Sequence, residues 1–313
     1  MSRSNVFTGL LTTTIMLLAA VVQAADHGDS LRLQKVSDGV YAIVGPFGNR
    51  SPDNLGNNAT FGFVVTDEGV VLVDPGGSHQ GAAAIDALIR RVTGQPVRIV
   101  INSGGQDHRW LGNGFFKHQG ARIIASRAAV DDQRARGAEQ LSVLHMLVGA
   151  AGMAHTEPVY ADETFEERLD FSLGGTAFEL RRVGPAHTPG DSLVWLPQQR
   201  IVFSGDAVYV GRMLGVLPQS KSALWIEAFA AMAALEPATV IPGHGPVADL
   251  ARARADSLDY LVFLRETVGA LMETGGDITQ IGTLDQSRFS YLEDYETLKG
   301  RNAQQVFQEM EWE

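Results

Sequence analysis

The sequence predicts an α+β fold in which two β-sheets pack against each other, with helices on their outer faces. Short apolar runs rich in β-branched residues alternate with segments of helical spacing. Glycine is frequent, at 34 of 313 residues, and its placement between these runs favours strands and loops over a helical bundle. Because we find neither an internal repeat nor a linker-like stretch, we expect a single domain over residues 25–313.

The first half of the chain is expected to form strands before it alternates strands with helices. The turns Ser37-Asp38-Gly39 and Thr66-Asp67-Glu68-Gly69 indicate two hairpins, and a polar loop over 47–58 lies between them. The expected strands cover residues 31–36, 40–44, 60–65, 70–73, 97–101 and 121–125. The expected helices, each with an apolar face at helical spacing, cover residues 83–92 and 127–148.

The second half follows the same order, with strands first and helices after them. Its expected strands cover residues 176–183, 192–196, 200–203 and 239–241. Its expected helices cover residues 224–235, 250–272 and 295–310. Two strand clusters, each followed by strand–helix alternation, are best explained by two packed sheets.

Residues 1–24 have the features of a signal peptide. Arg3 supplies the positive end, residues 10–22 are largely apolar, and Ala24 is a small residue suited to cleavage. The apolar run is shorter than a typical membrane span. We therefore expect export to the periplasm without stable membrane insertion, and an uncleaved anchor is the alternative.

The charge balance argues against nucleic acid as a partner. The formal net charge is −11, and cleavage would make it more negative by removing Arg3, so a phosphate backbone would be repelled. The chain has no cysteine, so any metal site must be built from His, Asp and Glu. That ligand set suits zinc, manganese or iron better than copper(I).

Four short motifs place His and Asp side chains directly after predicted strands. Asp107 and His108 follow the strand at 97–101. His187 lies in a turn rich in Gly and Pro, Asp206 follows the strand at 200–203, and His244 lies in a Pro-Gly-His-Gly turn. Each has an ordinary alternative, such as an Asp–His hydrogen bond, a turn histidine or a helix N-cap. Since all four motifs end strands, their side chains can meet at one edge and hold a divalent cation.

The order Asp-His, His-Thr-x-Gly-Asp, Gly-Asp and Pro-Gly-His-Gly resembles the metallo-β-lactamase superfamily of hydrolases, over residues 40–245. The turn Asp74-Pro75-Gly76 resembles the structural Asp-x-Gly turn of that family. The resemblance implies a four-layer αβ/βα sandwich, with metal ligands on loops along one edge of the two sheets.

Family members usually read Asn-Thr-His-x-His-x-Asp-His at the first motif. The resemblance implies that the two leading histidines, with His187, hold a first metal. The Asp and the final His, with His244, hold a second metal, and Asp206 matches the acid that bridges both in the glyoxalase-like branch. This chain reads Asn102-Ser103-Gly104-Gly105-Gln106-Asp107-His108, which is one residue shorter and lacks both leading histidines.

The incomplete motif predicts one metal rather than two. The first site keeps only His187 and a share of Asp206, whereas the second keeps a full set, Asp107, His108, Asp206 and His244. We expect zinc there, with iron or manganese as the other candidates, and a bound water with a pKa lowered toward neutrality. His187 is then free to orient substrate or to carry a proton.

The resemblance implies an exported metal-dependent hydrolase of the glyoxalase-like or quinoprotein-associated branch. Its small-molecule substrate would contain an ester, thioester, lactone or amide, and Asp107 and His187 are the candidate catalytic residues. Arg212 or Lys221 are candidates for binding a substrate carboxylate, as in relatives. One alternative is an inactive periplasmic accessory protein of an oxidase or dehydrogenase, and a second is an iron-dependent oxygenase.

Overall fold

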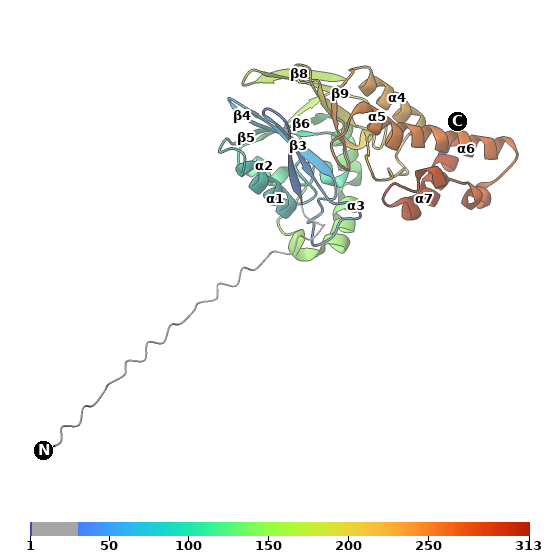
Figure 1. The fold of residues 1–313 in the computed structure, drawn as a ribbon, viewed down its shortest axis with the longest axis horizontal. Helices are drawn as coiled ribbons and strands as arrows, with labels where there is room; N and C mark the ends of the chain where they lie inside the picture. The colour runs from blue at the N-terminus through green and yellow to red at the C-terminus, as the bar shows by residue number, and fades with distance from the viewer. Residues whose placement is uncertain (2–30) are drawn as a thin grey trace.

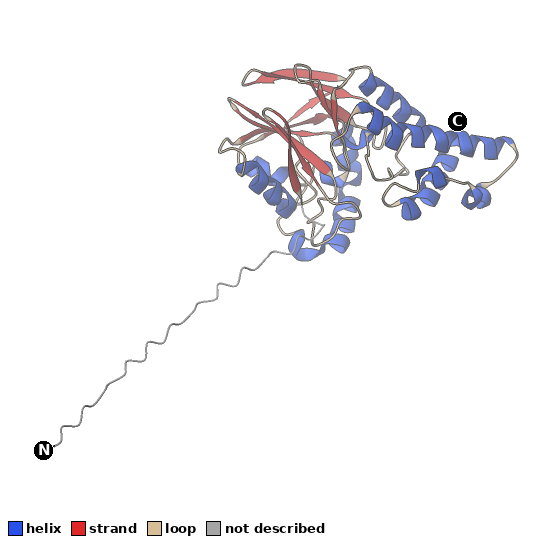
Figure 2. Ribbon diagram, in the orientation of Figure 1, coloured by secondary structure: helices blue, strands red, loops and turns tan. Residues whose placement is uncertain are grey.

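The chain forms a sandwich of two sheets with helices on the outside, as Figures 1 and 2 show. The computed structural model describes residues 31–313 together with Met1, so the predicted signal peptide lies outside the described residues. The architecture confirms the predicted α+β sandwich. Along residues 31–313, no helix combines the length and the apolar character that a membrane crossing would need.

Within residues 31–313, the first sheet contains seven strands in sequence order. Its first four strands pair antiparallel, and from β4 onward the pairing is parallel. The strands are β1 (Arg32–Ser37), β2 (Val40–Val44), β3 (Thr60–Thr66), β4 (Gly69–Val73), β5 (Val97–Asn102), β6 (Arg122–Ser126) and β7 (Glu163–Phe165).

In the same described part of the chain, the second sheet contains five strands in the order β12-β11-β10-β9-β8. Only β11 and β12 pair parallel in it; the other neighbours are antiparallel. The strands are β8 (Arg168–Leu173), β9 (Thr176–Arg182), β10 (Ser192–Leu196), β11 (Ile201–Phe203) and β12 (Thr239–Ile241).

Apolar side chains from both sheets form the central core. Residues such as Val71 and Ile101 of the first sheet pack against Phe178 and Phe203 of the second. Each fully buried side chain of this kind contributes about 1.5–3 kcal/mol relative to an exposed one. The sheets approach so closely that a Cβ added at Gly62 would lie 2.4 Å from the Phe203 ring, which excludes any larger residue there.

Helices cover the outer faces of both sheets. The helices α1 (His79–Arg90) and α2 (Asn113–His118) pack on the first sheet, and α4 (Ser222–Ala233) and α5 (Leu250–Ala253) pack on the second. The long helix α3 (Arg127–Gly152) lies beside them and contacts β6 and β7. The sequence therefore folds into helix, sheet, sheet and helix layers.

The C-terminal region adds a helical subcluster beside the second sheet. It contains α6 (Asp259–Glu273) and α7 (Tyr295–Met310), which pack together with α4. A π-helical segment, Arg254–Leu258, interrupts the single helix that the sequence predicts over 250–272. The interruption has a structural use, because Asp256 accepts from the Gly211 amide at 2.7 Å and Ser257 Oγ accepts from the Tyr209 amide at 2.9 Å.

Strand ends from both sheets meet at one edge of the sandwich. Because β11 and β12 are parallel, the segments that follow them leave the sheet on the same side. The two sheets are joined there by hydrogen bonds from the Ser192 amide to the Ser103 carbonyl at 2.7 Å and from the Thr60 amide to the Gly243 carbonyl at 2.7 Å. This edge carries the predicted motifs.

Candidate metal centre

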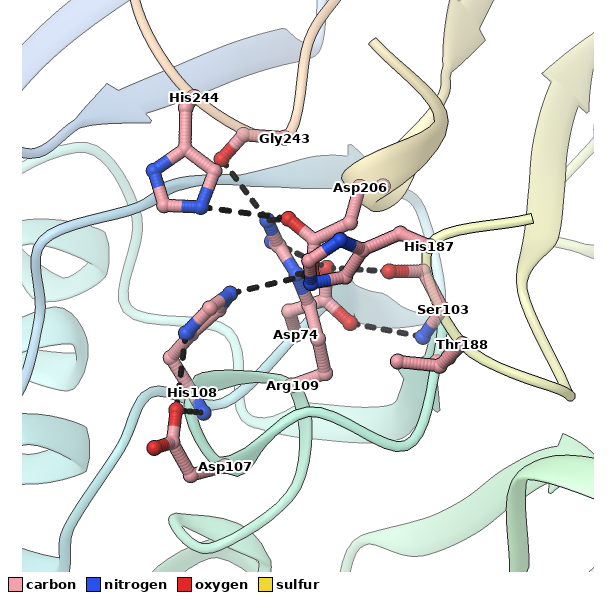
Figure 3. A network of polar contacts seen from close by, with 12 residues as sticks. Asp74, Ser103, Asp107, His108, Arg109, His187, Thr188, Asp206, Gly243 and His244 are labelled. Carbon is pink, nitrogen blue, oxygen red and sulfur yellow. Dashed lines mark hydrogen bonds and ion pairs between the residues drawn. The ribbon is translucent and has the colours of Figure 1, made fainter. Parts of the chain in front are cut away.

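Three predicted residues, His108, Asp206 and His244, meet at this edge. His108 Nε2 lies 3.2 Å from Asp206 Oδ2, and His244 Nε2 lies 3.3 Å from Asp206 Oδ1. One ligand atom from each residue lies within 4.8 Å of the other two, and all three residues are buried. Figure 3 shows the two imidazoles and the carboxylate pointing toward one another.

Hydrogen bonds to the opposite ring nitrogens orient both imidazoles. His108 Nδ1 lies 3.0 Å from Asp107 Oδ1, and His244 Nδ1 lies 3.0 Å from the Asn58 carbonyl oxygen. Arg50 Nη2 also lies 3.0 Å from His108 Nδ1, but it makes a shorter bond, 2.6 Å, to Asp107 Oδ1. With the proton on Nδ1, as Asp107 and the Asn58 carbonyl favour, each Nε2 directs its lone pair at Asp206. Burial lowers the pKa of His244 well below its ordinary value, so this ring is neutral. Two lone pairs facing a carboxylate require a shared cation or proton, and this donor set fits a divalent metal.

Arg109 lies beneath the cluster as a fully buried cation. Its Nε and Nη2 donate to the two oxygens of Asp206 at 3.1 and 2.7 Å, and its Nη1 donates to Asp74 at 2.9 Å. Two backbone carbonyls, of Thr60 and Gly243, accept the remaining bonds at 3.0 and 2.8 Å. Burial opposes ionisation of Asp206, but Arg109, together with His108 and His244, outweighs it and holds the pKa of that carboxyl well below its ordinary value.

Asp107 occupies a different position from the one predicted for a ligand. Its carboxylate accepts from Arg50 Nη2 at 2.6 Å and from the His108 amide at 2.7 Å, on the side of His108 that faces away from Asp206. Burial alone would raise the pKa of Asp107, yet the Arg50 guanidinium and His108 together lower it below the ordinary value. The structure makes Asp107 the ionised group that orients His108, and it does not bring Asp107 into the ligand group.

The geometry indicates how the altered motif corresponds to the family pattern. Counted from Asn102 without a gap, the eight-residue pattern places His108 where family members have Asp, and Arg109 where they have the final His. His108 and Arg109 thus stand at the positions of two metal ligands in the family pattern, and both contact the carboxylate of Asp206. Arg109 was missed by sequence reasoning, although its place beside the motif was the available signal.

Asp191 and Thr188 occupy the space beside Gly104, where the family pattern has a histidine of the first metal site. A Cβ added at Gly104 would lie 2.7 Å from Asp191 Oδ1 and 3.3 Å from Thr188 Oγ1, so a larger side chain does not fit there. Gln106 directs a buried Oε1 that has no hydrogen-bond partner within the described part of the chain. His187 lies beside Asp206 in Figure 3 but outside the ligand group.

His187 is held as a neutral, buried imidazole. Its Nδ1 lies 3.0 Å from the Gly215 carbonyl oxygen, which leaves Nε2 without a partner among the described residues. Burial lowers the pKa of His187 to about 4. At neutral pH its Nε2 can therefore accept a proton or a hydrogen bond.

A cavity of about 300 Å³ opens onto the cluster and is lined by His108, His187 and His244. Tyr209 also lines it, with its ring stacked on His244 at a centroid distance of 4.5 Å. Burial raises the pKa of Tyr209 well above its ordinary value, so the phenol keeps its proton. Sequence reasoning did not single out Tyr209, although it follows Asp206 by three residues on the same loop.

Known proteins resemble this chain in sequence over its central part. The family model described as the metallo-beta-lactamase superfamily matches residues 56–244. The 2,4-dinitroanisole O-demethylase subunit alpha of Nocardioides sp. (strain JS1661) is 26% identical over 184 residues, which are 57% of this chain and 50% of that protein. This chain thus spans about half the length of that relative. Metallo-beta-lactamase type 2 of Elizabethkingia meningoseptica is 23% identical over 200 residues, 63% of this chain and 71% of the relative.

Solved structures share the fold. A metallo-beta-lactamase from Pontibacter korlensis superposes with a TM-score of 0.59 at 23% identity, over 74% of this chain and 99% of the other. The stereoselective inverting sec-alkylsulfatase Pisa1 from Pseudomonas sp. superposes with a TM-score of 0.67 at 17% identity, over 89% of this chain and 50% of the other. Since the family model covers more than half of its residues, the chain belongs to the metallo-beta-lactamase superfamily.

Proposed function

We propose that this protein is a hydrolase that uses one divalent metal, zinc, held by His108, Asp206 and His244. The convergence of two imidazole Nε2 atoms and one carboxylate within 4.8 Å supports this proposal most directly. A divalent metal bound there would polarise a carbonyl oxygen and lower the pKa of a water molecule. Membership in a superfamily of typical hydrolases agrees with that chemistry.

The residues around the cluster would supply a hydrogen-bond donor, a proton acceptor and a group that orients a metal ligand. Tyr209 retains its phenolic proton and can donate a hydrogen bond to the oxygen on which negative charge develops. Neutral His187 can accept a proton at Nε2 while Nδ1 stays on the Gly215 carbonyl. Asp107 keeps His108 in the required tautomer and does not contact substrate.

The scissile bond in this proposal is an ester, thioester, lactone or amide of a small molecule. The named relatives are an O-demethylase subunit, β-lactamases and an alkylsulfatase, so the superfamily alone does not fix the bond. We also propose export to the periplasm through residues 1–24, where a redox enzyme is a candidate partner. The inactive-scaffold alternative is not favoured, because the ligand group is retained.

A second candidate is an iron-dependent oxygenase. The specific observation in its favour is the ligand set, since two histidines and one carboxylate are the arrangement that holds Fe(II) in many oxygenases. Aerobic oxygen consumption by the iron-loaded protein, without hydrolysis by the zinc-loaded protein, would favour this candidate over the hydrolase.

Metal analysis combined with hydrolysis assays tests the proposal. Purified full-length protein supplied with zinc, iron or manganese should retain about one equivalent of metal, and His244→Ala should lose it. The exposed His118 provides a matched control, because His118→Ala removes an imidazole that is not in the ligand group. Hydrolysis of a panel of nitrophenyl esters, thioesters and lactones should require the metal and His244. Retention of less than about a tenth of an equivalent of any metal would refute the proposal.

A further inference from the structure

The cavity over the metal cluster has a wall that the family match does not include. Residues 56–244 carry the match, whereas α7 lies at Tyr295–Met310. Thr297, Leu298 and Arg301 of this helix line the cavity, as do Val143 and Leu147 of α3. Any selectivity that α7 imposes therefore comes from a part of the chain that the family model does not match.

Hydrogen bonds fix α7 against the loop that follows Asp206. Arg212 Nε donates to Asp294 Oδ2 at 2.7 Å, at the start of the helix. The Met213 amide donates to the Glu293 carbonyl at 2.9 Å, and the Glu293 amide donates to the Gly211 carbonyl at 3.0 Å. These bonds hold the start of α7 beside the ligand-bearing loop, so the helix is a built wall of the cavity.

The cavity is rich in arginine although the chain is acidic. Among the described residues, Arg50, Arg212 and Arg301 line it together with a single carboxylate, Asp294, in a protein of formal net charge −11. Arg50 is paired with Asp107 at 2.6 Å and Arg212 with Asp294. Within residues 31–313, Arg301 has no carboxylate within 4.0 Å, so its positive charge is available to a ligand.

We propose that this cavity selects small organic anions, and that Arg301 binds their anionic group. The apolar part of the ligand lies against Val143, Leu147 and Leu298, and the bond to be cleaved lies at the cluster. A volume of about 300 Å³ limits the ligand to a small molecule. The inference rests on the proposed function, because it names the substrate class for the same site. The anionic group is a carboxylate or a sulfonate-type group, either of which a guanidinium binds.

Ligand binding without turnover tests this inference separately from hydrolysis. We would measure calorimetric affinities of 3-phenylpropanoate, 2-phenylethanesulfonate and neutral 3-phenylpropanamide, with both chelator-treated and zinc-loaded full-length protein. Both anions should bind at least about fivefold more tightly than the amide at low salt, and added NaCl should reduce the difference. The ratio of the two anion affinities distinguishes a carboxylate preference from a sulfonate preference.

Three variants identify the residue responsible. Arg301→Gln should weaken both anions by about fivefold to tenfold and leave the amide unchanged, and Arg301→Lys should restore most of the affinity. Lys299→Gln is the matched control, since it removes a cation from the same helix at a position that does not line this cavity. Equal affinities for anion and amide, anion binding that survives Arg301→Gln, or no binding of either anion would each overturn the inference. Hydrolysis is not part of the measurement, so an inactive protein that still binds anions through Arg301 would refute only the proposed function.

Discussion

Replacement of Arg109 by methionine tests whether its guanidinium holds the centre together. Methionine keeps the apolar stem of the side chain but removes all five hydrogen bonds that Arg109 donates. Asp206 and Asp74 would then be buried without their shared cation, and two backbone carbonyls would lose a donor. Breaking a buried ion pair on one side typically costs about 3–5 kcal/mol, so we expect Arg109→Met to lower the free energy of unfolding by that amount.

Urea denaturation of the metal-free protein measures this loss. The control is Arg127→Met, which removes an exposed ion pair with Glu166 at 3.0 Å and should change the free energy of unfolding by less than about 0.5 kcal/mol. If Arg109→Met costs less than about 1 kcal/mol, the guanidinium is not the counter-charge of the buried carboxylates and the reasoning fails.

The pH dependence of the same variant gives an independent check. In the wild type, Arg109 is the main group that, with His108 and His244, keeps the pKa of Asp206 well below its ordinary value. The stabilisation is therefore present above about pH 4 and is lost as the pH falls through the folded pKa. In Arg109→Met, burial is no longer opposed by the guanidinium and should raise that pKa. The variant then gains stability as the pH falls, and its deficit should shrink between about pH 8 and pH 5.

Three further predictions concern the surroundings of the ligand group. Asp107→Asn should weaken zinc binding by about 10- to 100-fold in competition with a chromophoric chelator, because it removes the group that orients His108, and His108→Ala should weaken it further. Equal losses would place Asp107 among the ligands. In metal-free protein, burial raises the pKa of Asp191 to about 7, so the folded chain holds a proton that the unfolded chain has lost. The free energy of unfolding should therefore fall as the pH rises from about 4 to about 7, by at most about 4 kcal/mol. Urea denaturation at several pH values measures this slope, and Asp191→Asn should abolish it. Gly104→His should leave the zinc stoichiometry at about one by metal analysis, because its Cβ would meet Asp191 Oδ1, and a second equivalent would show that the first site can be rebuilt.

Much of the fold could be predicted because the periodicity of apolar residues reports burial directly. The turn Ser37-Asp38-Gly39 predicts a hairpin, and Gly39 indeed has a φ of 74° between β1 and β2. The strand β8 was not predicted, although its alternating half-buried and exposed residues carry the signal of an edge strand. The π-helical segment could not be predicted, because it depends on bonds from Asp256 and Ser257 to a distant loop.

The candidate site could be predicted only as far as its residue types. Asp107 and His108 are neighbours in one short 3-10 turn, Asp107–Arg109, and sequence alone cannot say which of two adjacent side chains faces the other sheet. The packing of Arg109 determines which side chain faces the other sheet. Its guanidinium reaches Asp206, 97 residues away in the chain, and this contact fixes the turn beneath the cluster. Long-range ion pairs of this kind leave no local pattern.

The distribution of unpaired polar atoms argues that the altered motif is an adapted site and not a decayed one. In a decaying site, we would expect buried charges to lose their partners first, yet Asp107 and Asp206 both retain cationic partners. The buried atoms without partners among the described residues belong instead to neutral groups, or to a guanidinium whose other nitrogen is already paired. They include Gln106 Oε1, Asn58 Oδ1 and Arg50 Nε. Unsatisfied groups are rare in protein interiors and are expected where water or a ligand supplies the missing bond. The surroundings of Gly104 and Gln106 therefore keep their buried charges paired and leave neutral polar groups open to water or a ligand, as the proposed one-metal centre requires.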